Sequence, residues 1–559
     1  MATKAVSSTG AETVAQVSWL PMVIILMAQM QMAFNVNALP VSIGPIVEDL
    51  EAPATAIGTA LVIYSLFVAA FVMLGAKIGK IFGERLVFQV TVVLHGLAMG
   101  IMAFSPNAGA MNSAQAIAGL AAAALVPTLV VLIAANYQGK QQEQALGLLA
   151  GAPAMAGVLA FLVAGFLGTV LSWRYSFGLL LVVSVIIFFL SFRLKPVARQ
   201  TGIKIDTVGA VLAAIAIILI SFGFNNLNAW GLVLARPGAP FSLLGVSPAP
   251  LMITLGVVVG QAFFTWSHYR QDMNKSPLFA LEVLDSVYER AAIFALLIIG
   301  ALGPAINFLI PLYIQIVQGR TSLQTAVATV PYTLAIFGAA VLIVRLYDRF
   351  TPRQIGAVGF VIVATGLTIL AFAIDNSWGT PMVILGLVVL GLGEGALLTL
   401  LFNVLVSVSP KSLAGDVGAL RGTANNLSTA VGTAVAGAMS VGLLAMLITS
   451  SLVNNPDLPP QLQSQVNLDS INFVSNDQLL ETLSETTATP EQVAAAVEIN
   501  TVARLRALKI SFLFLAGIAL VAIFPALRLP RYKPDEVSSA EIQGAAQEGK
   551  RRGEAKRRR

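Results

Sequence analysis

The chain has 559 residues, of which 57% are apolar and 11% are charged, and its mean hydropathy is +0.84. An average soluble protein is about 25% charged, so this composition excludes a water-soluble domain and indicates an integral membrane protein. The chain contains no cysteine and two histidines, which excludes thiolate chemistry and a histidine-rich metal centre. The net charge of +6 does not point to nucleic acid, because the basic residues are distributed by membrane side. We expect no cofactor and no metal.

Long apolar runs divide the chain into predicted membrane-spanning helices. Roughly 20 mostly apolar residues cross about 30 Å of hydrocarbon, and a helix satisfies its own backbone hydrogen bonds in lipid. We therefore predict an all-α polytopic membrane protein with fourteen spans. The predicted spans cover residues 18–39, 54–76, 86–104, 112–136, 144–168, 176–194, 206–227, 248–268, 291–316, 325–344, 354–374, 381–406, 422–449 and 509–529.

The positively charged residues assign the two sides of the membrane. An even number of spans places both termini on one side. With residues 1–17 in the cytoplasm, the cytoplasmic segments hold 27 Lys and Arg residues and the external segments hold six. Because cytoplasmic loops carry the excess of Lys and Arg, we expect both termini to be cytoplasmic and the protein to lie in the cell (plasma or inner) membrane.

Two segments are too polar to cross a membrane. Residues 450–505 contain seven acidic residues, and we expect an external loop there, with a short amphipathic helix over 490–507. Residues 530–559 form a basic cytoplasmic tail that ends in four consecutive basic residues. Anionic lipid headgroups attract such a cluster by about 1 kcal/mol per charge, so we expect anionic lipids as partners of the tail. A generic solubilising tail is the alternative.

Two predicted cytoplasmic loops resemble each other. Residues 78–85 read IGKIFGER, and residues 346–353, after the tenth span, read LYDRFTPR. The residues they share are Phe82 with Phe350 and Arg85 with Arg353. Many transporters are built from repeats, with the substrate site at the midplane between the halves. We therefore predict an N-terminal six-helix half over 18–194, an inserted two-helix hairpin over 206–268 and a C-terminal six-helix half over 291–529.

Several short motifs give the chain a resemblance to a known family. The first span ends in the sequence NALP at 37–40, and the fourth contains GLAAA at 119–123, followed by Pro127. The fifth span is followed by SWRYSF at 172–177, and a long polar segment precedes the last span. In these features residues 17–530 resemble the Major Facilitator Superfamily, specifically its branch of 14-helix drug:proton antiporters. The resemblance implies the major facilitator fold and solute transport by alternating access.

The chain departs from this branch at several polar positions. The branch has an Asp in the first span where Gln31 stands, an Asp in the following loop where Lys80 stands, and an Arg in the fourth span where Gln115 stands. Uncharged polar groups near the middle of the membrane suit hydrogen bonding to a solute. Structural hydrogen bonding between helices is the alternative. The polar residues that we predict to line a cavity are Gln31, Asn35, Asn37, Gln115 and Asn307.

Charged residues of the two similar loops are candidates for a cytoplasmic gate. The resemblance implies that this loop pairs with helix ends across the interface between the halves. A helix C-terminus carries about half a negative charge, which favours nearby cations. The alternative is that these cations only orient the chain in the membrane. The predicted gate residues are Lys77, Lys80, Arg85, Asp348, Arg349 and Arg353.

One carboxylate, Glu394, lies deep inside a predicted span. It stands about halfway along residues 381–406, between Gly393 and Gly395. An ionised acid there costs several kcal/mol unless it is paired or hydrated, so such residues usually face the protein interior and are functional. We predict that Glu394 carries a proton or binds the cationic end of a solute, in place of the acid that the first span lacks. A hydrogen-bonded structural glutamate is the alternative.

These features favour a secondary transporter that exports amphipathic or lipophilic solutes, drug-like or lipid, with proton coupling through Glu394. The alternatives are an uncoupled or lipid-specific carrier and, in a different class, a transporter-like membrane sensor. The chain lacks the phosphate-binding motif of ATP-driven pumps and a Ser/His or His/Asp constellation, so we expect no enzymatic activity. The expected partners are the lipid bilayer, a small amphipathic solute and protons, and not nucleic acid.

The charge distribution generates a topology prediction. Because the natural chain has no cysteine, a Ser464→Cys variant carries a single reactive thiol in the segment predicted to be external. We expect a membrane-impermeant maleimide to label this thiol in intact cells. Labelling that occurs only after the cytoplasmic side is exposed would overturn the fourteen-span topology.

Overall fold

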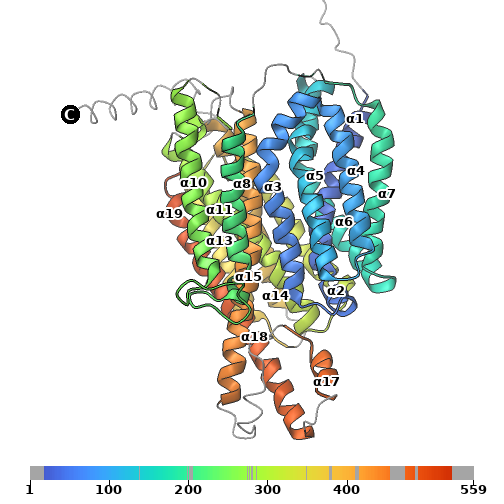
Figure 1. The fold of residues 1–559 in the computed structure, drawn as a ribbon, viewed down its shortest axis with the longest axis vertical. Coiled ribbons are helices and arrows are strands. Elements are labelled where there is room, and N and C mark those ends of the chain that lie inside the picture. The colour runs from blue at the N-terminus through green and yellow to red at the C-terminus, as the bar shows by residue number, and fades with distance from the viewer. Residues whose placement is uncertain are drawn as a thin grey trace, which may run out of the picture.

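The computed structural model in Figure 1 is a bundle of helices that run mostly side by side. Thirteen described helices are long and apolar enough to cross a membrane, and a fourteenth, α6, has a described apolar stretch over Met155–Val170. Together with the absence of strands from the described residues, this confirms the all-α polytopic membrane class. The structure describes residues 18–531 except 138, 198, 200–204, 274, 276, 279–280, 285, 348, 377–380, 409–413, 454–472 and 485–488.

The first group of helices packs together at the right of Figure 1. In it, α1 contacts α6 and α7, while α5 packs between α3 and α4. Its elements are α1 (Leu20–Val41), α2 (Ile43–Asp49), α3 (Ala54–Phe82), α4 (Glu84–Ala103), α5 (Ala108–Asn136), α6 (Gly139–Val170), α7 (Arg174–Leu190) and the 3₁₀ turn η1 (Ser191–Arg193).

A second group follows in the C-terminal part of the chain. Here α14 packs against α11, α12 and α13, and α15 packs against α11 and α18. The elements are η2 (Leu281–Leu284), α11 (Val287–Leu312), the π-helical turn η3 (Tyr313–Val317), α12 (Ser322–Leu342), η4 (Ile343–Leu346), α13 (Pro352–Ala373), α14 (Pro381–Val408), α15 (Ala414–Val453), α17 (Asn476–Ser484), α18 (Pro490–Val521) and α19 (Ile523–Ala526).

A hairpin lies between the two groups in the sequence and packs over the seam between them. Its helices are α8 (Thr207–Asn225), α9 (Leu227–Trp230) and α10 (Pro248–Asp272). α8 contacts both α3 and α15, and these two helices also contact each other across the seam. On the other side of the seam, α6 packs against α12. Two helix pairs, α3 with α15 and α6 with α12, therefore form the main interface between the halves.

Equivalent close contacts recur in the two halves. A Cβ atom added at Gly119 of α5 would lie 2.5 Å from the carbonyl oxygen of Tyr64 on α3, and one added at Gly391 of α14 would lie 2.6 Å from that of Tyr332 on α12. Tyr332 follows Tyr64 by 268 residues, the separation that also relates Phe82 to Phe350. The structure thus repeats the same tyrosine–glycine contact where the loop sequences repeat.

The SWRYSF segment is explained by α2, a short helix that the sequence did not predict. Asp49 of α2 accepts hydrogen bonds from Trp173 Nε1 at 2.9 Å and from Arg174 Nε at 3.0 Å. Arg174 Nη1 also donates to the carbonyl oxygens of Ala103 and Ser105, at 3.1 and 2.7 Å. These bonds join α2, the end of α4 and the start of α7. We call the end of the bundle that holds α2 and α17 the external end, after the predicted topology.

The segment predicted as an external loop is partly helical. α15 continues to Val453, and the predicted helix over 490–507 is not separate from the last span. Instead α18 begins at Pro490, behind a capping box in which Thr489 and Gln492 bond each other's backbone, and runs unbroken to Val521. Its Ala-rich stretch at 494–496 contains no helix breaker, which explains the continuity. Figure 1 shows α17 and the ends of α15 and α18 projecting beyond the bundle.

The tight glycine contacts generate a stability prediction. A Cβ at Gly395 would collide with the carbonyl oxygen of Ile336 on α12, whereas one at Gly338, also on α12, meets nothing within 4 Å. We expect Gly395→Ala to cost about 1–3 kcal/mol by overpacking and to lower the thermal unfolding midpoint in detergent. The control Gly338→Ala should leave the midpoint unchanged or raise it, because Ala favours helix over Gly by about 0.5–1 kcal/mol. Equal midpoints for both variants would contradict the contact.

Candidate functional site

Glu394 lies in the interior of the C-terminal half. It is 6% exposed, and its Oε2 accepts a hydrogen bond from the hydroxyl of Tyr332 at 2.5 Å. This bond crosses from α12 to α14. The structure therefore places the predicted carboxylate inside the protein, with one polar partner, as expected for an acid that is expensive to expose to lipid.

Glycines on two faces of α14 fix the direction in which Glu394 points. Gly391 and Gly395 bring the backbone of α12 so close that any side chain there would collide with it. On another face, a Cβ at Gly393 would lie 3.0 Å from the carbonyl oxygen of Gly359 on α13. With α12 and α13 on these faces, Glu394 is directed toward α11.

The space for the Glu394 side chain is created by a glycine of α11. A Cβ at Gly303 would collide with Glu394 Oε1, so even an alanine would displace the carboxylate. Pro304 follows directly and lacks the backbone N–H of a normal helix residue, which frees the carbonyl of Gly300 from its helical donor. A buried acid, a phenolic hydroxyl and a weakened stretch of α11 therefore meet at one point.

The N-terminal half has no acid at the corresponding place. Three residues after the glycine that contacts the tyrosine carbonyl, α14 carries Glu394 and α5 carries Ala122. Ala122 is fully buried. The repeated architecture thus supports an acidic site in one half only.

The polar residues predicted to line a cavity have mixed environments. Asn35 and Gln115 exchange two side-chain hydrogen bonds, of 2.9 and 3.0 Å, between α1 and α5. Gln31 Oε1 accepts a bond from Ser184 Oγ of α7 at 2.9 Å. These three side chains are buried and join helices within the N-terminal half, which is the structural alternative considered for them. Their role toward a solute stays a prediction.

Asn37 and Asn307 are half-buried. The Asn37 amide donates to the carbonyl of Ala33 in its own helix at 2.7 Å, and a Cβ at Gly157 of α6 would lie 3.8 Å from it. Asn307 follows Gly303 by one turn on α11. Of the five predicted polar residues, these two retain accessible side chains.

Of the predicted gate residues of the first loop, Arg85 bonds within its own half. Lys77 and Lys80 lie near the end of α3. Arg85 Nη2 donates to the carbonyl of Phe192 at 2.8 Å, and its guanidinium lies 5.8 Å from the ring centre of Phe192. Arg85 thus ties α4 to the end of α7. Pairing of this loop with the other half stays a prediction.

In the second loop, the backbone N–H of Arg353 donates to the carbonyl of Pro530 at 3.2 Å, which ties the start of α13 to the end of the C-terminal half. Arg349 precedes α13. Asp348 lies outside the described residues. The gate function of this loop also remains a prediction.

A buried acid near the first loop was missed by the sequence analysis. Glu84, at the start of α4, is 3% exposed and its Oε2 accepts a hydrogen bond from Thr128 Oγ1 of α5 at 2.9 Å. Its place at the edge of an apolar run made it indistinguishable from a solvated loop residue. It fastens α4 to α5 beside Gly79, where a Cβ would collide with the carboxylate.

The two halves are also joined by an amide clamp at the external end. Gln315, in the π-helical turn η3, donates from Nε2 to the carbonyl oxygens of Pro40 and Val41, at 3.2 and 2.9 Å. Its Oε1 accepts from the backbone N–H of Gly44 at 2.7 Å. One side chain thus binds the end of α1 and the start of α2. A primary amide supplies the two donor hydrogens and the acceptor oxygen that this arrangement needs, whereas a hydroxyl or a neutral imidazole has one donor hydrogen.

The turn that carries Gln315 is held by a buried arginine of α18. Arg504 donates to the carbonyl oxygens of Ile316 and Val317, each at 3.1 Å, and to that of Val474 at 3.2 Å. π-helical turns leave backbone groups without regular partners and are frequent at functional sites. Arg504 supplies partners for two of these carbonyls and connects the external segment at Val474 to the clamp.

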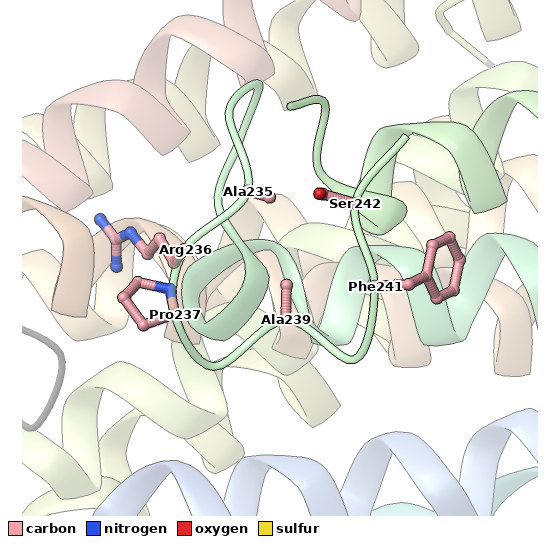
Figure 2. A pocket seen from close by; sticks show the side chains of 6 residues that line it. All are labelled: Ala235, Arg236, Pro237, Ala239, Phe241 and Ser242. Carbon is pink, nitrogen blue, oxygen red and sulfur yellow. The ribbon is translucent and has the colours of Figure 1, made fainter. Parts of the chain in front are cut away.

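Figure 2 shows a hollow in the loop between α9 and α10. In this view the Arg236 guanidinium and the Phe241 ring point to opposite sides of the loop. The remaining lining residues are small, so the hollow offers few groups for binding a solute, and the candidate site lies among the helices. The lining residues are Ala235, Arg236, Pro237, Ala239, Phe241 and Ser242.

Comparison with known proteins assigns the family. Residues 25–433 match the family profile of the Major Facilitator Superfamily. The chain belongs to the Major Facilitator Superfamily. It is therefore a transporter of that family, and the resemblance read from the sequence motifs is confirmed.

Several curated relatives are efflux proteins of bacteria. The chain is 25% identical over 450 residues to "Multidrug efflux pump LfrA" of Mycolicibacterium smegmatis, covering 80% of this chain and 84% of the relative. It is 25% identical over 443 residues to "Puromycin resistance protein pur8" of Streptomyces alboniger, covering 76% and 82%. It is 24% identical over 450 residues to "Probable actinorhodin transporter" of Streptomyces coelicolor, covering 78% and 74%.

Solved transporter structures share the fold at low sequence identity. A bacterial homologue of the human lysosomal transporter Spinster, in an inward-facing and unoccupied conformation, matches with a TM-score of 0.58 and 13% identity, covering 93% of this chain and 98% of that one. A mutant of the peptide transporter POT in complex with alafosfalin matches with a TM-score of 0.59 and 13% identity, covering 92% and 95%. At these identities the likeness concerns the fold alone.

The amide clamp generates a prediction about access from outside. Gln315→Leu removes three hydrogen bonds between the halves, each worth about 1 kcal/mol net. Ser42 is buried between α1 and α2. In a Ser42→Cys background we expect Gln315→Leu to raise the rate of reaction of the cysteine with an impermeant external maleimide by about a hundredfold.

Gln318→Leu is the matched control, because Gln318 donates to Tyr313 within the C-terminal half at 2.9 Å and not across the seam. It should leave the labelling rate of Ser42→Cys unchanged. Equal rates for the two leucine variants would show that the clamp does not hold the external end closed.

Proposed function

We propose that this transporter exports amphipathic, lipophilic solutes by alternating access and that Glu394 couples this export to protons. The named relatives include multidrug and antibiotic efflux proteins, which favours solutes of this kind. The observation that carries the coupling is the carboxyl of Glu394, buried between three helices with the Tyr332 hydroxyl as its polar contact.

The environment of Glu394 makes its charge state matter. When it is ionised, the negative charge is stabilised by one hydrogen bond from Tyr332, whereas a buried charge usually needs full pairing. A proton or the cationic end of a solute would each neutralise it. Because the two compete for one carboxylate, binding of one favours release of the other, which is the requirement for antiport.

No other titratable side chain is recorded against Glu394 in the described part of the chain. α11 presents Gly303 to the carboxylate, and α12 presents Tyr332. α13 packs against α14 at Gly393, on a face about 100° from that of Glu394. The pH dependence of the site is therefore expected to follow Glu394 with its tyrosine partner.

Alternating access requires the external end to open. In this proposal the Gln315 clamp and the bond from the Leu323 backbone N–H to Thr169 Oγ1, 3.1 Å long, close that end. These four hydrogen bonds connect the N-terminal half to the C-terminal half, so rocking of the halves would break them. The predicted cytoplasmic loop residues would form the opposite gate when the movement reverses.

The proposed setting is the cell membrane, with both termini in the cytoplasm and the basic tail near anionic lipids. The relatives are bacterial, and the Lys and Arg distribution favours this orientation. A membrane sensor with the same fold would bind solute without moving it. Counterflow of a labelled solute in proteoliposomes separates the two, because a sensor produces none.

Glu394→Gln is the central test of coupling. The amide keeps the size and the hydrogen bond to Tyr332 but does not bind a proton at physiological pH. We expect the variant to fold, to bind uncharged solutes and to lose the dependence of transport on pH, measured as solute-driven proton movement in proteoliposomes.

Tyr332→Phe and Tyr64→Phe form a matched pair for the same test. Each tyrosine contacts a glycine at the repeated position, but only Tyr332 bonds a carboxylate. Tyr332→Phe should shift the pH profile of transport, and Tyr64→Phe should not. A wild-type pH profile in both Glu394→Gln and Tyr332→Phe would make Glu394 structural and the carrier independent of protons.

A further inference from the structure

A polar stripe begins at the predicted cytoplasmic end of the apolar part of α15, which covers Leu420–Leu452, and continues into it. Arg421 and Asn425 are exposed and Thr429 is half-buried. They follow one another at intervals of four residues, which places them on one face of the helix. Asn425 and Thr429 lie inside the apolar part of the helix, where polar side chains are costly against lipid, so the surroundings of this face decide what the stripe does.

Contacts on both sides of the stripe show that it faces the gap between the halves. At about 100° per residue, Asn425 and Thr429 lie between the direction of Ser428 and that of Gly422. A Cβ at Gly300 of α11 would lie 3.2 Å from Ser428, and one at Gly422 would lie 3.7 Å from Val72 of α3. The stripe is thus directed between α11 and α3.

The opposite face of α15 is covered by the hairpin. Leu427 packs against residues of α3 and α8, including Ala70 and Ile217. Ala430 and Ala434 pack against Val62 and Phe224. With α8 on that face, the stripe is turned away from the lipid side and toward the interior of the transporter.

The cation of the stripe has an aromatic partner but no acidic one. The guanidinium of Arg421 lies 3.8 Å from the ring centre of Phe402 on α14, a cation–π contact. Among the residues whose side chains the structure describes, no carboxylate pairs with it. The side-chain amide of Asn425, one turn away, makes no hydrogen bond to a side chain or backbone group that the structure describes. Arg421 is therefore positioned by an aromatic ring, and the two neighbouring donors keep free hydrogen-bonding capacity.

Glu394 and Arg421 occupy different depths of the same half. Arg421 contacts the ring of Phe402 on α14. Phe402 follows Glu394 by eight residues, which is about 12 Å along the helix. The positive group lies toward the predicted cytoplasmic end and the acid lies deeper. At this separation an anionic group at Arg421 does not have to contact the carboxylate.

We propose that Arg421 and Asn425 bind the anionic headgroup, a carboxylate or a phosphate, of an amphipathic ligand that enters between α3 and α11. This inference rests on the proposed function and names a ligand class for it. Arg forms strong charge-assisted hydrogen bonds with both groups, and Asn425 adds amide donors beside it. The apolar tail would extend along the seam, where α3 presents Val72 beside Gly422 of α15. The headgroup belongs either to a bilayer phospholipid or to a free anionic amphiphile.

Binding to the full chain in phosphatidylcholine nanodiscs tests the site. The probes are a dansylated fatty acid and a dansylated alkyl trimethylammonium of the same chain length. We expect Arg421→Gln to weaken binding of the fatty acid about tenfold or more and to leave the cationic probe unchanged. Arg421→Lys should retain part of the affinity, and Asn425→Leu should lower it a few-fold.

Arg290→Gln is the matched control, because Arg290 is an exposed arginine in the first turn of α11. Unchanged binding of the fatty acid in Arg421→Gln, or an equal loss for both probes, overturns the proposal. If Arg421→Gln does not fold, unchanged fatty-acid affinity in both Arg421→Lys and Asn425→Leu overturns it instead. Failure of the proposed function appears separately, as absent counterflow of the cationic probe by the wild-type protein.

Nanodiscs of phosphatidylglycerol distinguish the two sources of the headgroup. If this lipid displaces the fatty acid from the wild-type protein and leaves the cationic probe bound, the site is assigned to a phospholipid. Retention of the fatty acid in both lipids assigns it to a free amphiphile. Loss of both probes in phosphatidylglycerol would contradict a site that is selective for anions.

Discussion

Close approach of helix backbones at glycines is the constraint on which the rest of this structure depends. Lipid offers helices no hydrophobic reason to associate, so packing and interhelical hydrogen bonds hold the bundle together. Gly391 and Gly395 bring α14 onto α12, and Gly303 leaves room for the Glu394 carboxylate. The same residues that pack the half therefore also orient its acid. A methyl group at any of them moves both.

The sequence predicted those features that depend on local composition. The spans follow from hydropathy, and Glu394 stood out because a carboxylate in the middle of an apolar run is rare. The amide clamp could not be predicted in this way, because Gln315 and its partner Gly44 are separated by 271 residues and each looks ordinary alone. The hydrogen bonds of Arg504 could not be predicted for the same reason, because its partners Ile316 and Val317 are 188 and 187 residues away in the sequence. The α15 stripe could not be predicted either, because the direction that it faces depends on which helices pack against the other faces of α15.

Polar residues inside the bundle divide into two groups by the partners they find. Asn35 and Gln115 satisfy each other, which stiffens the N-terminal half. Arg421 and Asn425 keep free capacity in the seam. Uncharged composition alone does not distinguish these cases, so the predicted role of Asn35 and Gln115 toward a solute stays a prediction beside their observed role in joining helices. Ala122 stands in the N-terminal half at the position that corresponds to Glu394. The N-terminal half therefore has no ionisable side chain at this repeated position.

The length of α15 has a mechanical consequence. Its 40 residues extend about 60 Å, roughly twice the hydrocarbon thickness of a bilayer. One rod thus carries the seam contact with α3, the polar stripe and, at Ser450, the projecting external end. A rigid rod amplifies angular motion in proportion to its length, so a tilt of a few degrees at the seam displaces the external tip by several ångströms. A small rotation of one half against the other is therefore seen most clearly as a displacement of the external end of α15, the part farthest from its contact with α3.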